Sequence, residues 1–135
     1  MTGPEYRVWT DGASRGNPGP SAIGVSVRDG DDREVAVASE AIGRATNNVA
    51  EYRALLKALD LLRELGATRA RFHLDSQLIV RQMTGEYRVK DPKMRALSLE
   101  VMKRIRDLVS YSFHHVPRAE NKRADALANR ALDRD

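Results

Sequence analysis

The sequence of 135 residues contains no cysteine and no long hydrophobic run. Without cysteine there is no disulfide, thiolate metal ligand or cysteine nucleophile, so any metal must be held by oxygen or imidazole ligands. No stretch approaches the ~18 apolar residues of a membrane span, and residues 1–7 do not resemble a cleavable signal peptide. These absences predict a cytoplasmic protein with no membrane partner.

The chain also lacks internal repeats, linkers and low-complexity stretches. A chain of this length can bury one hydrophobic core without disulfides or metals to stabilise it. We therefore expect a single domain over residues 1–135, and a monomer.

The formal net charge of +4 is unevenly distributed along the chain. Residues 1–80 carry 10 Lys and Arg against 11 Asp and Glu, whereas residues 81–135 carry 13 against 8. Such an excess is either the solvated face of a helix or a surface for a polyanion. The densest part contains Arg88, Lys90, Lys93, Arg95, Lys103, Arg104 and Arg106.

Alternating patterns, turn residues and helical stripes predict an α/β fold. The predicted strands cover residues 6–11, 21–28, 33–42, 70–75 and 110–116, and the predicted helices cover 46–65, 78–83, 93–109 and 121–132. The first three strands form an antiparallel meander, and the helix 46–65 carries the chain across to a parallel strand. The result is a five-stranded mixed sheet flanked by helices.

Two acids, Asp11 and Asp75, are predicted to end strands that lie parallel in this sheet. Parallel strands end at the same edge, where open sheets with helical crossovers bind ligands. Each acid alone also has an ordinary interpretation, because Asp is common beside a turn and at the start of a helix.

Two further acids lie on predicted helices. Glu51 falls on the apolar stripe of helix 46–65, although a capping box with Asn48 is an alternative explanation. Asp125 lies one position away from the apolar face of the last helix, where an ordinary exposed acid is the alternative. Carboxylates that converge repel each other unless cations hold them, and hard divalent ions prefer oxygen ligands. Two such ions are the usual arrangement for in-line displacement at a phosphodiester, so we expect cleavage of a nucleic acid.

The chain resembles a type 1 ribonuclease H. The resemblance lies in four segments that span nearly the whole chain in the family's order: residues 10–20 (TDGASRGNPGP), 46–51 (TNNVAE), 75–77 (DSQ) and 121–128 (NKRADALA).

This resemblance implies a ribonuclease H-like fold and an endonuclease that hydrolyses the RNA strand of RNA/DNA hybrids, leaving 5′-phosphate and 3′-hydroxyl ends. It implies two ions of Mg²⁺ or Mn²⁺, held by Asp11, Glu51, Asp75 and Asp125. The implied contacts to the RNA strand are Gly12, Ala13, Ser14, Asn17, Asn47, Asn48 and Gln77. Recognition of the 2′-hydroxyl by carboxylate, amide and backbone groups agrees with these residue types.

The sequence departs from the family pattern in two places. The short loop after residue 116 has no histidine, so Arg118 is the loop residue that we expect to contact the substrate phosphate or help product release. There is no room between Met83 and Pro92 for the basic handle helix of some members, and we expect no hybrid-binding domain before Tyr6. Arg88, Lys90 and Lys93 are the expected partial substitutes.

Three other interpretations stay open at this point. Integrases, resolvases and proofreading exonucleases place acids on a similar sheet, but the turn expected to contact the 2′-hydroxyl argues against them. A nucleic-acid-binding module without catalysis belongs to another class and is disfavoured because all four acids are present. A flavodoxin-like phosphate binder is disfavoured because the first strand leads to another strand. Double-stranded RNA is a further candidate substrate, and the sequence does not fix the preferred metal.

Overall fold

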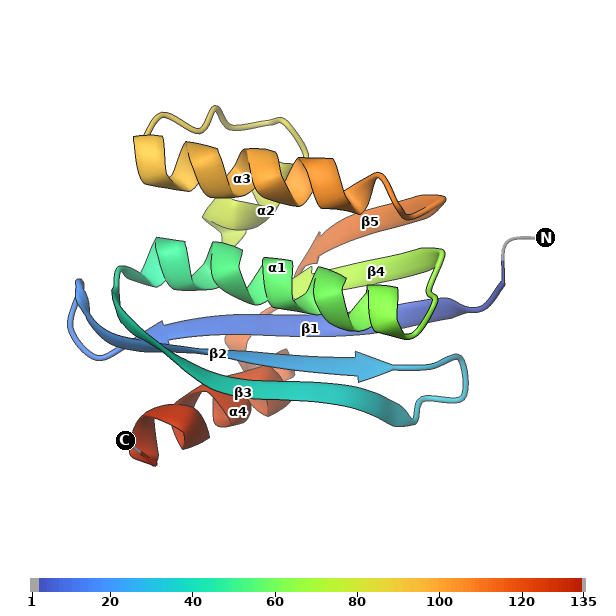
Figure 1. Ribbon diagram of the computed structural model, residues 1–135, viewed down its shortest axis with the longest axis horizontal. Helices are drawn as coiled ribbons and strands as arrows, with labels where there is room; N and C mark the ends of the chain where they lie inside the picture. Colours follow the sequence, from blue (N-terminus) through green and yellow to red (C-terminus); the bar gives the residue numbers. More distant parts are fainter. Residues whose placement is uncertain (1–2, 135) are drawn as a thin grey trace.

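The computed structural model describes residues 3–134, which form one five-stranded sheet with helices on both faces (Figure 1). The strand order is β3-β2-β1-β4-β5, so the predicted fold class is confirmed. The elements in chain order are β1 (Glu5–Ser14), β2 (Gly19–Arg28), β3 (Glu34–Ala45), α1 (Asn47–Glu64), β4 (Arg69–Leu74), α2 (Gln77–Met83), α3 (Pro92–Ile105), β5 (Ser110–His115), a 3₁₀ turn (Arg118–Glu120) and α4 (Lys122–Asp133).

The sheet is antiparallel on one side of β1 and parallel on the other. β1 pairs antiparallel with β2, and β2 with β3, whereas β4 runs parallel to both β1 and β5. Parallel neighbours need a long connection, and α1 and α3 provide these connections. β1 is therefore the central strand, with the ends of β1 and β4 at the same edge of the sheet.

Strand β1 continues past the point where the sequence predicted its end. Gly12 to Ser14 still pair with β2, in register with Ile23 to Ser21. Asp11 therefore lies inside a strand, opposite Gly24, and the turn of the hairpin begins only at Arg15. The prediction that Asp11 ends its strand was wrong, because turn-forming residue types do not by themselves break a ladder whose hydrogen bonds can still form.

Two other boundaries also differ from the prediction. β3 continues to Ala45, since Gly43 adopts a positive φ beside an irregularity in the pairing with β2 and the ladder resumes after it. α3 ends at Ile105 rather than 109, because the N–H groups of Val109 and Ser110 already donate to the carbonyl of Thr68 at the start of β5. Within residues 3–134, no helix is long and apolar enough to cross a membrane.

The main core lies between the sheet and the helices α1 and α3, with α4 on the opposite face (Figure 1). Val8 and Phe72 are neighbours in register on β1 and β4 and are fully buried, as is Leu55 on α1. Gly24 lets α4 approach its face closely, because a Cβ there would lie 2.0 Å from the carbonyl oxygen of Ala124. The two helices that carry Glu51 and Asp125 are thus fixed on opposite faces of β1.

Candidate active site

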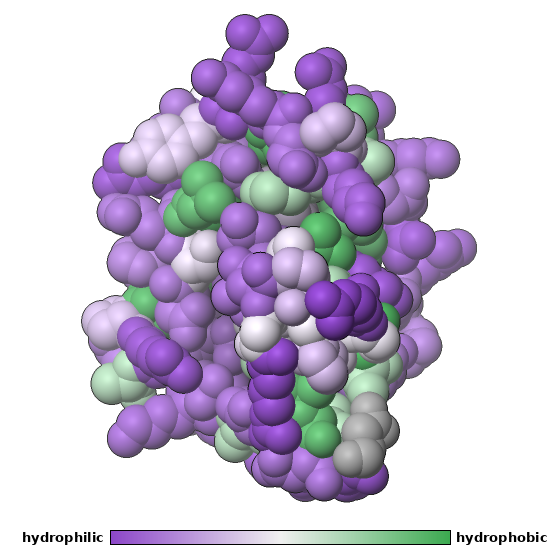
Figure 2. Space-filling view, turned by 90° about the vertical axis from the view of Figure 1, so that its left-hand side faces the viewer, coloured by the Kyte–Doolittle hydropathy of each residue, from purple (hydrophilic) through white to green (hydrophobic). Residues whose placement is uncertain are grey.

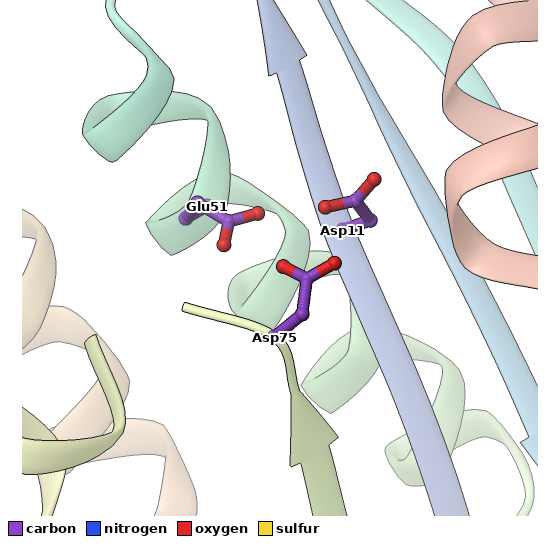
Figure 3. Close-up of side chains that lie close together, drawn as sticks. All are labelled: Asp11, Glu51 and Asp75. Atoms are coloured by element: carbon purple, nitrogen blue, oxygen red, sulfur yellow. The ribbon is translucent and has the colours of Figure 1, made fainter. Parts of the chain in front are cut away.

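Three carboxyl groups from distant parts of the chain meet beside the ends of β1 and β4. Asp11 comes from β1, Glu51 from the second turn of α1, and Asp75 directly follows β4. One oxygen of each lies within 4.8 Å of the others, and Figure 3 shows the three side chains directed toward one another. The structure therefore brings together three of the four predicted acids in one cluster.

Glu51 is held in the cluster by the backbone of β1. Its Oε1 accepts a hydrogen bond from the N–H of Gly12, and the side chain is buried. The cap of α1 is Thr46, whose hydroxyl accepts from the N–H of Val49, so the alternative of a capping box with Asn48 is wrong. Glu51 is free of any capping role and faces the sheet instead.

Asp75 also has no capping role. The next residue, Ser76, is the cap of α2, and its hydroxyl accepts from the N–H of Ile79. The interpretation of Asp75 as a helix cap is therefore wrong. Since Ser76 fixes the start of α2, the preceding carboxylate is left at the end of β4 beside Asp11.

The cluster is electrostatically unfavourable without a cation. Burial raises the pKa of Asp11 well above its usual range, and the nearby carboxylates of Glu51, Asp75 and Asp125 raise it further. Burial likewise raises the pKa of Glu51, although the hydrogen bond from Gly12 opposes this shift. Within the described part of the chain, no Lys or Arg forms an ion pair with Asp11, Glu51 or Asp75.

Asp125 lies on the other side of Asp11, in the first turn of α4. It is close enough to Asp11 to raise the pKa of that group, but it is outside the cluster of three. Its side chain is 31% exposed, and its Oδ1 lies 3.9 Å from Nη2 of Arg118. Arg118 itself is on the 3₁₀ turn and 82% exposed, so it stands at the rim of the site.

The acids line a cleft of about 570 Å³. Ten of the twelve predicted site residues line it: Asp11, Gly12, Ala13, Ser14, Asn47, Asn48, Glu51, Asp75, Arg118 and Asp125. Three further residues line the cleft: Arg15, Ser76 and Asn129. Arg15 and Ser76 lie within the motif segments 10–20 and 75–77, whereas Asn129 was missed by the sequence argument. Asn129 follows Asp125 by four residues, so helical spacing was the signal that could have found it.

Asn17 and Gln77 are not among the residues that line the cleft. The side-chain oxygen of Asn17 accepts from the N–H of Asn47, 3.1 Å away, and so ties the β1–β2 turn to the start of α1. This contact gives Asn17 a clear place in positioning the cleft wall. Gln77 is exposed on the first turn of α2.

The end of the molecule at which α1 and α3 begin is mostly hydrophilic, with only small, separated apolar groups (Figure 2). Part of the basic run lies at this end, since Lys93 and Arg95 are exposed in the first turn of α3 and Arg88 and Lys90 precede it. Arg104, at the other end of α3, pairs with Glu100 and Asp60. The charge of Arg104 is therefore neutralised locally, whereas no ion pair is formed by Arg88, Lys90, Lys93 or Arg95 within residues 3–134.

The donor set of the cluster fits hard divalent cations. It offers carboxylate oxygens only, without the thiolate or imidazole ligands that softer metals prefer. A divalent ion would relieve the repulsion among buried acids that lack a cationic partner. Asp11, Glu51 and Asp75 are therefore the residues that could hold such an ion.

This sheet order, with acids converging from β1, α1 and the end of β4, defines the ribonuclease H-like class of α/β folds. In agreement, residues 9–131 match a protein family described as reverse transcriptase-like. The chain is 45% identical over 131 residues to ribonuclease HI of Halobacterium salinarum. The aligned region covers 97% of this chain and 66% of that protein. It is 47% identical over 127 residues to a bifunctional protein of Mycobacterium tuberculosis, covering 93% of this chain but 35% of that protein.

Solved structures show the same likeness in three dimensions. The crystal structure of RNase H1 from Halobacterium salinarum superposes with a TM-score of 0.95 at 44% identity, covering 97% of this chain and 99% of that one. LC11-RNase H1 in complex with an RNA/DNA hybrid superposes with a TM-score of 0.91 at 40% identity, covering 96% and 97%. The chain belongs to the ribonuclease H family.

Proposed function

We propose that the protein is an endonuclease that hydrolyses the RNA strand of RNA/DNA hybrids. The observation that carries this proposal is the cluster of Asp11, Glu51 and Asp75 in an open polar cleft. Membership of the ribonuclease H family supports it, and so does a relative of similar structure that was solved with an RNA/DNA hybrid. We further propose that residues 1–135 act as one catalytic domain.

The four acids Asp11, Glu51, Asp75 and Asp125 are proposed as the ligands of two ions, Mg²⁺ or Mn²⁺. When bound, these ions would activate the attacking water and stabilise the leaving oxygen. Cleavage of the bond between phosphorus and the 3′-oxygen then gives a 3′-hydroxyl and a 5′-phosphate. The chain itself contributes the orientation of the acids, since the N–H of Gly12 fixes Glu51 and the cap at Ser76 leaves Asp75 free.

Selection of RNA is proposed to occur on the wall formed by β1 and the start of α1. The 2′-hydroxyl both donates and accepts hydrogen bonds, and the cleft offers matching groups in Glu51, Asn47, Asn48 and the backbone of residues 12–14. Asn17 would support this wall by holding the β1–β2 turn against α1. Gln77, at the start of α2, is a further proposed contact. Arg118, at the rim, is placed to contact a phosphate.

Cleavage of a hybrid labelled on its RNA strand tests the proposal directly. Wild type should cut the RNA with Mg²⁺ or Mn²⁺ and stop when a chelator is added, and Asp75→Asn should be inactive. Asp31→Asn is a charge-matched control, because Asp31 is exposed in the turn before β3. Cleavage of an all-DNA duplex instead would favour the integrase and exonuclease interpretation. Binding without cleavage under either metal would indicate a non-catalytic module, and an all-RNA duplex run alongside tests the second candidate substrate.

A further inference from the structure

Asn129 lines the cleft and donates a side-chain hydrogen bond to the carboxylate of Asp125. Among the lining residues other than the four acids, it alone makes such a side-chain hydrogen bond to one of these acids. Its Nδ2 lies 3.2 Å from Oδ1 of Asp125 and 3.0 Å from the main-chain oxygen of the same residue. The opposite amide orientation would set two oxygens against each other, so the donor must face Asp125. The contact is therefore specific in both direction and partner.

Asp125 needs such a contact more than the buried acids Asp11 and Glu51 do. Asp11 and Glu51 are 6% exposed and are fixed by the surrounding structure, whereas the side chain of Asp125 is 31% exposed at the start of a helix. An exposed carboxylate samples several rotamers, and the distant guanidinium of Arg118 at 3.9 Å does not fix one. Of the side chains on α4, only that of Asn129 donates a hydrogen bond to this carboxylate.

Asn129 lies on the same stripe of α4 as Asp125. Asp125, Asn129 and Asp133 recur at a spacing of four residues, and so form one stripe beside the apolar face of the helix. Arg15 of the β1–β2 turn donates to Asp133, 2.5 Å away, which joins the end of this stripe to the opposite wall of the cleft. Asn129 thus lies between the acid at the site and an exposed ion pair that links the helix to the turn.

We propose that Asn129 is a positioning residue that holds the carboxylate of Asp125 in the orientation required for binding a divalent ion and for cleavage. The proposal rests on the function proposed above and adds a residue that none of the four motif segments contains. Residues that hydrogen-bond to a metal ligand typically change metal affinity or activity about 10- to 100-fold when they are removed. We expect the lower part of this range, because Asp125 is partly exposed.

The test compares wild type, Asn129→Ala, Asn129→Gln and the control Arg130→Ala, which alters an exposed neighbour on the same helix. For Asn129→Ala we expect kcat to fall about tenfold, with KM for the hybrid within about twofold and weaker binding of Mn²⁺ in calorimetry. Alanine favours helices more than asparagine does, so the thermal midpoint of the metal-free protein should not fall. Asn129→Gln keeps the amide donor and should recover most of kcat, whereas Arg130→Ala should behave as wild type.

Three results would overturn the proposal. One is a kcat and a Mn²⁺ affinity of Asn129→Ala that both match wild type. Another is a rise in KM alone, which would make Asn129 a substrate contact rather than a positioning residue. A third is a loss of activity that follows a lower thermal midpoint and is equal in Asn129→Gln, which would indicate a purely structural role. If wild type itself cuts no hybrid, the proposed function fails, while calorimetry still decides whether Asn129 affects ion binding.

Discussion

Glu51 accepts a hydrogen bond from the main-chain N–H of Gly12, and this bond joins helix α1 to strand β1 immediately after Asp11. The two elements approach so closely that a Cβ on residue 12 would lie 2.3 Å from the carbonyl carbon of Ala50 and 2.4 Å from the nitrogen of Glu51. Glycine is required there for space, since its φ is not positive. The same close approach places two of the acids side by side.

Gly12→Ala should therefore destabilise the fold and disturb the acid cluster together. The backbone of α1 must move to admit the methyl group, and overpacking of this kind costs about 1–3 kcal/mol. We expect a lower thermal midpoint and a large loss of hybrid cleavage at a temperature where the variant is still folded. Gly30→Ala is the matched control, because a Cβ at residue 30 meets nothing within 4 Å. Equal midpoints for the two variants would refute the packing argument.

The convergence of Asp11 and Asp75 was predictable because it depends only on strand direction. A helical crossover makes two strands parallel, and Thr10 pairs with Leu74, so the residues that come next, Asp11 and Asp75, lie near each other although β1 continues past Asp11. Glu51 was likewise predictable from its position on the apolar stripe of its helix. These inferences used periodicity and chain order, which the sequence carries directly.

What the sequence could not provide are the contacts that depend on distances between elements. Capping of α1 by Thr46 rather than Asn48 follows from where the backbone turns, and both residue types are good caps. The end of β1 at Ser14 depends on pairing with β2, which overrides the local preference of residues 12–14. Asn129, in contrast, could have been inferred from its spacing of four residues from Asp125, because such residues are neighbours on a helix.

Asp11→Asn should stabilise the metal-free protein while abolishing cleavage. Because burial and the neighbouring carboxylates raise the pKa of Asp11, the folded state retains a proton that the unfolded chain releases above the ordinary carboxyl range. Folding of wild type therefore becomes less favourable as the pH rises through that range, whereas folding of the Asn variant avoids this proton uptake. The gain in thermal midpoint over wild type should thus be larger at about pH 8 than at about pH 4.

Thermal unfolding in the presence of a chelator measures this gain across the pH series. Asp31→Asn removes one charge from an exposed position and should leave the midpoint nearly unchanged at every pH. A gain for Asp11→Asn that is independent of pH would show that the proton on Asp11 is not its source. Addition of Mg²⁺ should raise the midpoint of wild type and have little effect on Asp11→Asn, because the ion takes over the role of the proton.

Arg118→Ala should lower turnover without changing stability. The guanidinium is 82% exposed and 3.9 Å from Asp125, and an exposed ion pair of this kind contributes little to the free energy of unfolding. Loss of a hydrogen-bond donor to a charged transition state in a closed site lowers kcat by ~10²–10³. Arg118 is an exposed donor at the rim, so its loss should lower kcat only about tenfold. Steady-state cleavage measures the turnover and thermal unfolding measures the stability. Arg33→Ala, in the β2–β3 turn, is the control. An unchanged kcat would remove Arg118 from the proposed set.

Charge reversal at the two ends of α3 should separate substrate binding from helix stability. Lys93 is exposed in the first turn, at the end of the molecule where α1 also begins, and Lys103 is exposed in the last turn (Figure 1). A glutamate in the first turn of a helix stabilises the helix, whereas one in the last turn destabilises it. An effect through helix stability alone would therefore make Lys103→Glu the more damaging substitution. We expect the reverse order for binding, so Lys93→Glu should weaken the affinity for the hybrid more than Lys103→Glu does. It should also reduce the slope of the logarithm of the binding constant against the logarithm of the salt concentration by about one, the value for one lost phosphate contact. The measurement is a salt series of hybrid binding in the Asp75→Asn background, and equal slopes for the two reversals would mean that residues 88–95 are only a solvated surface.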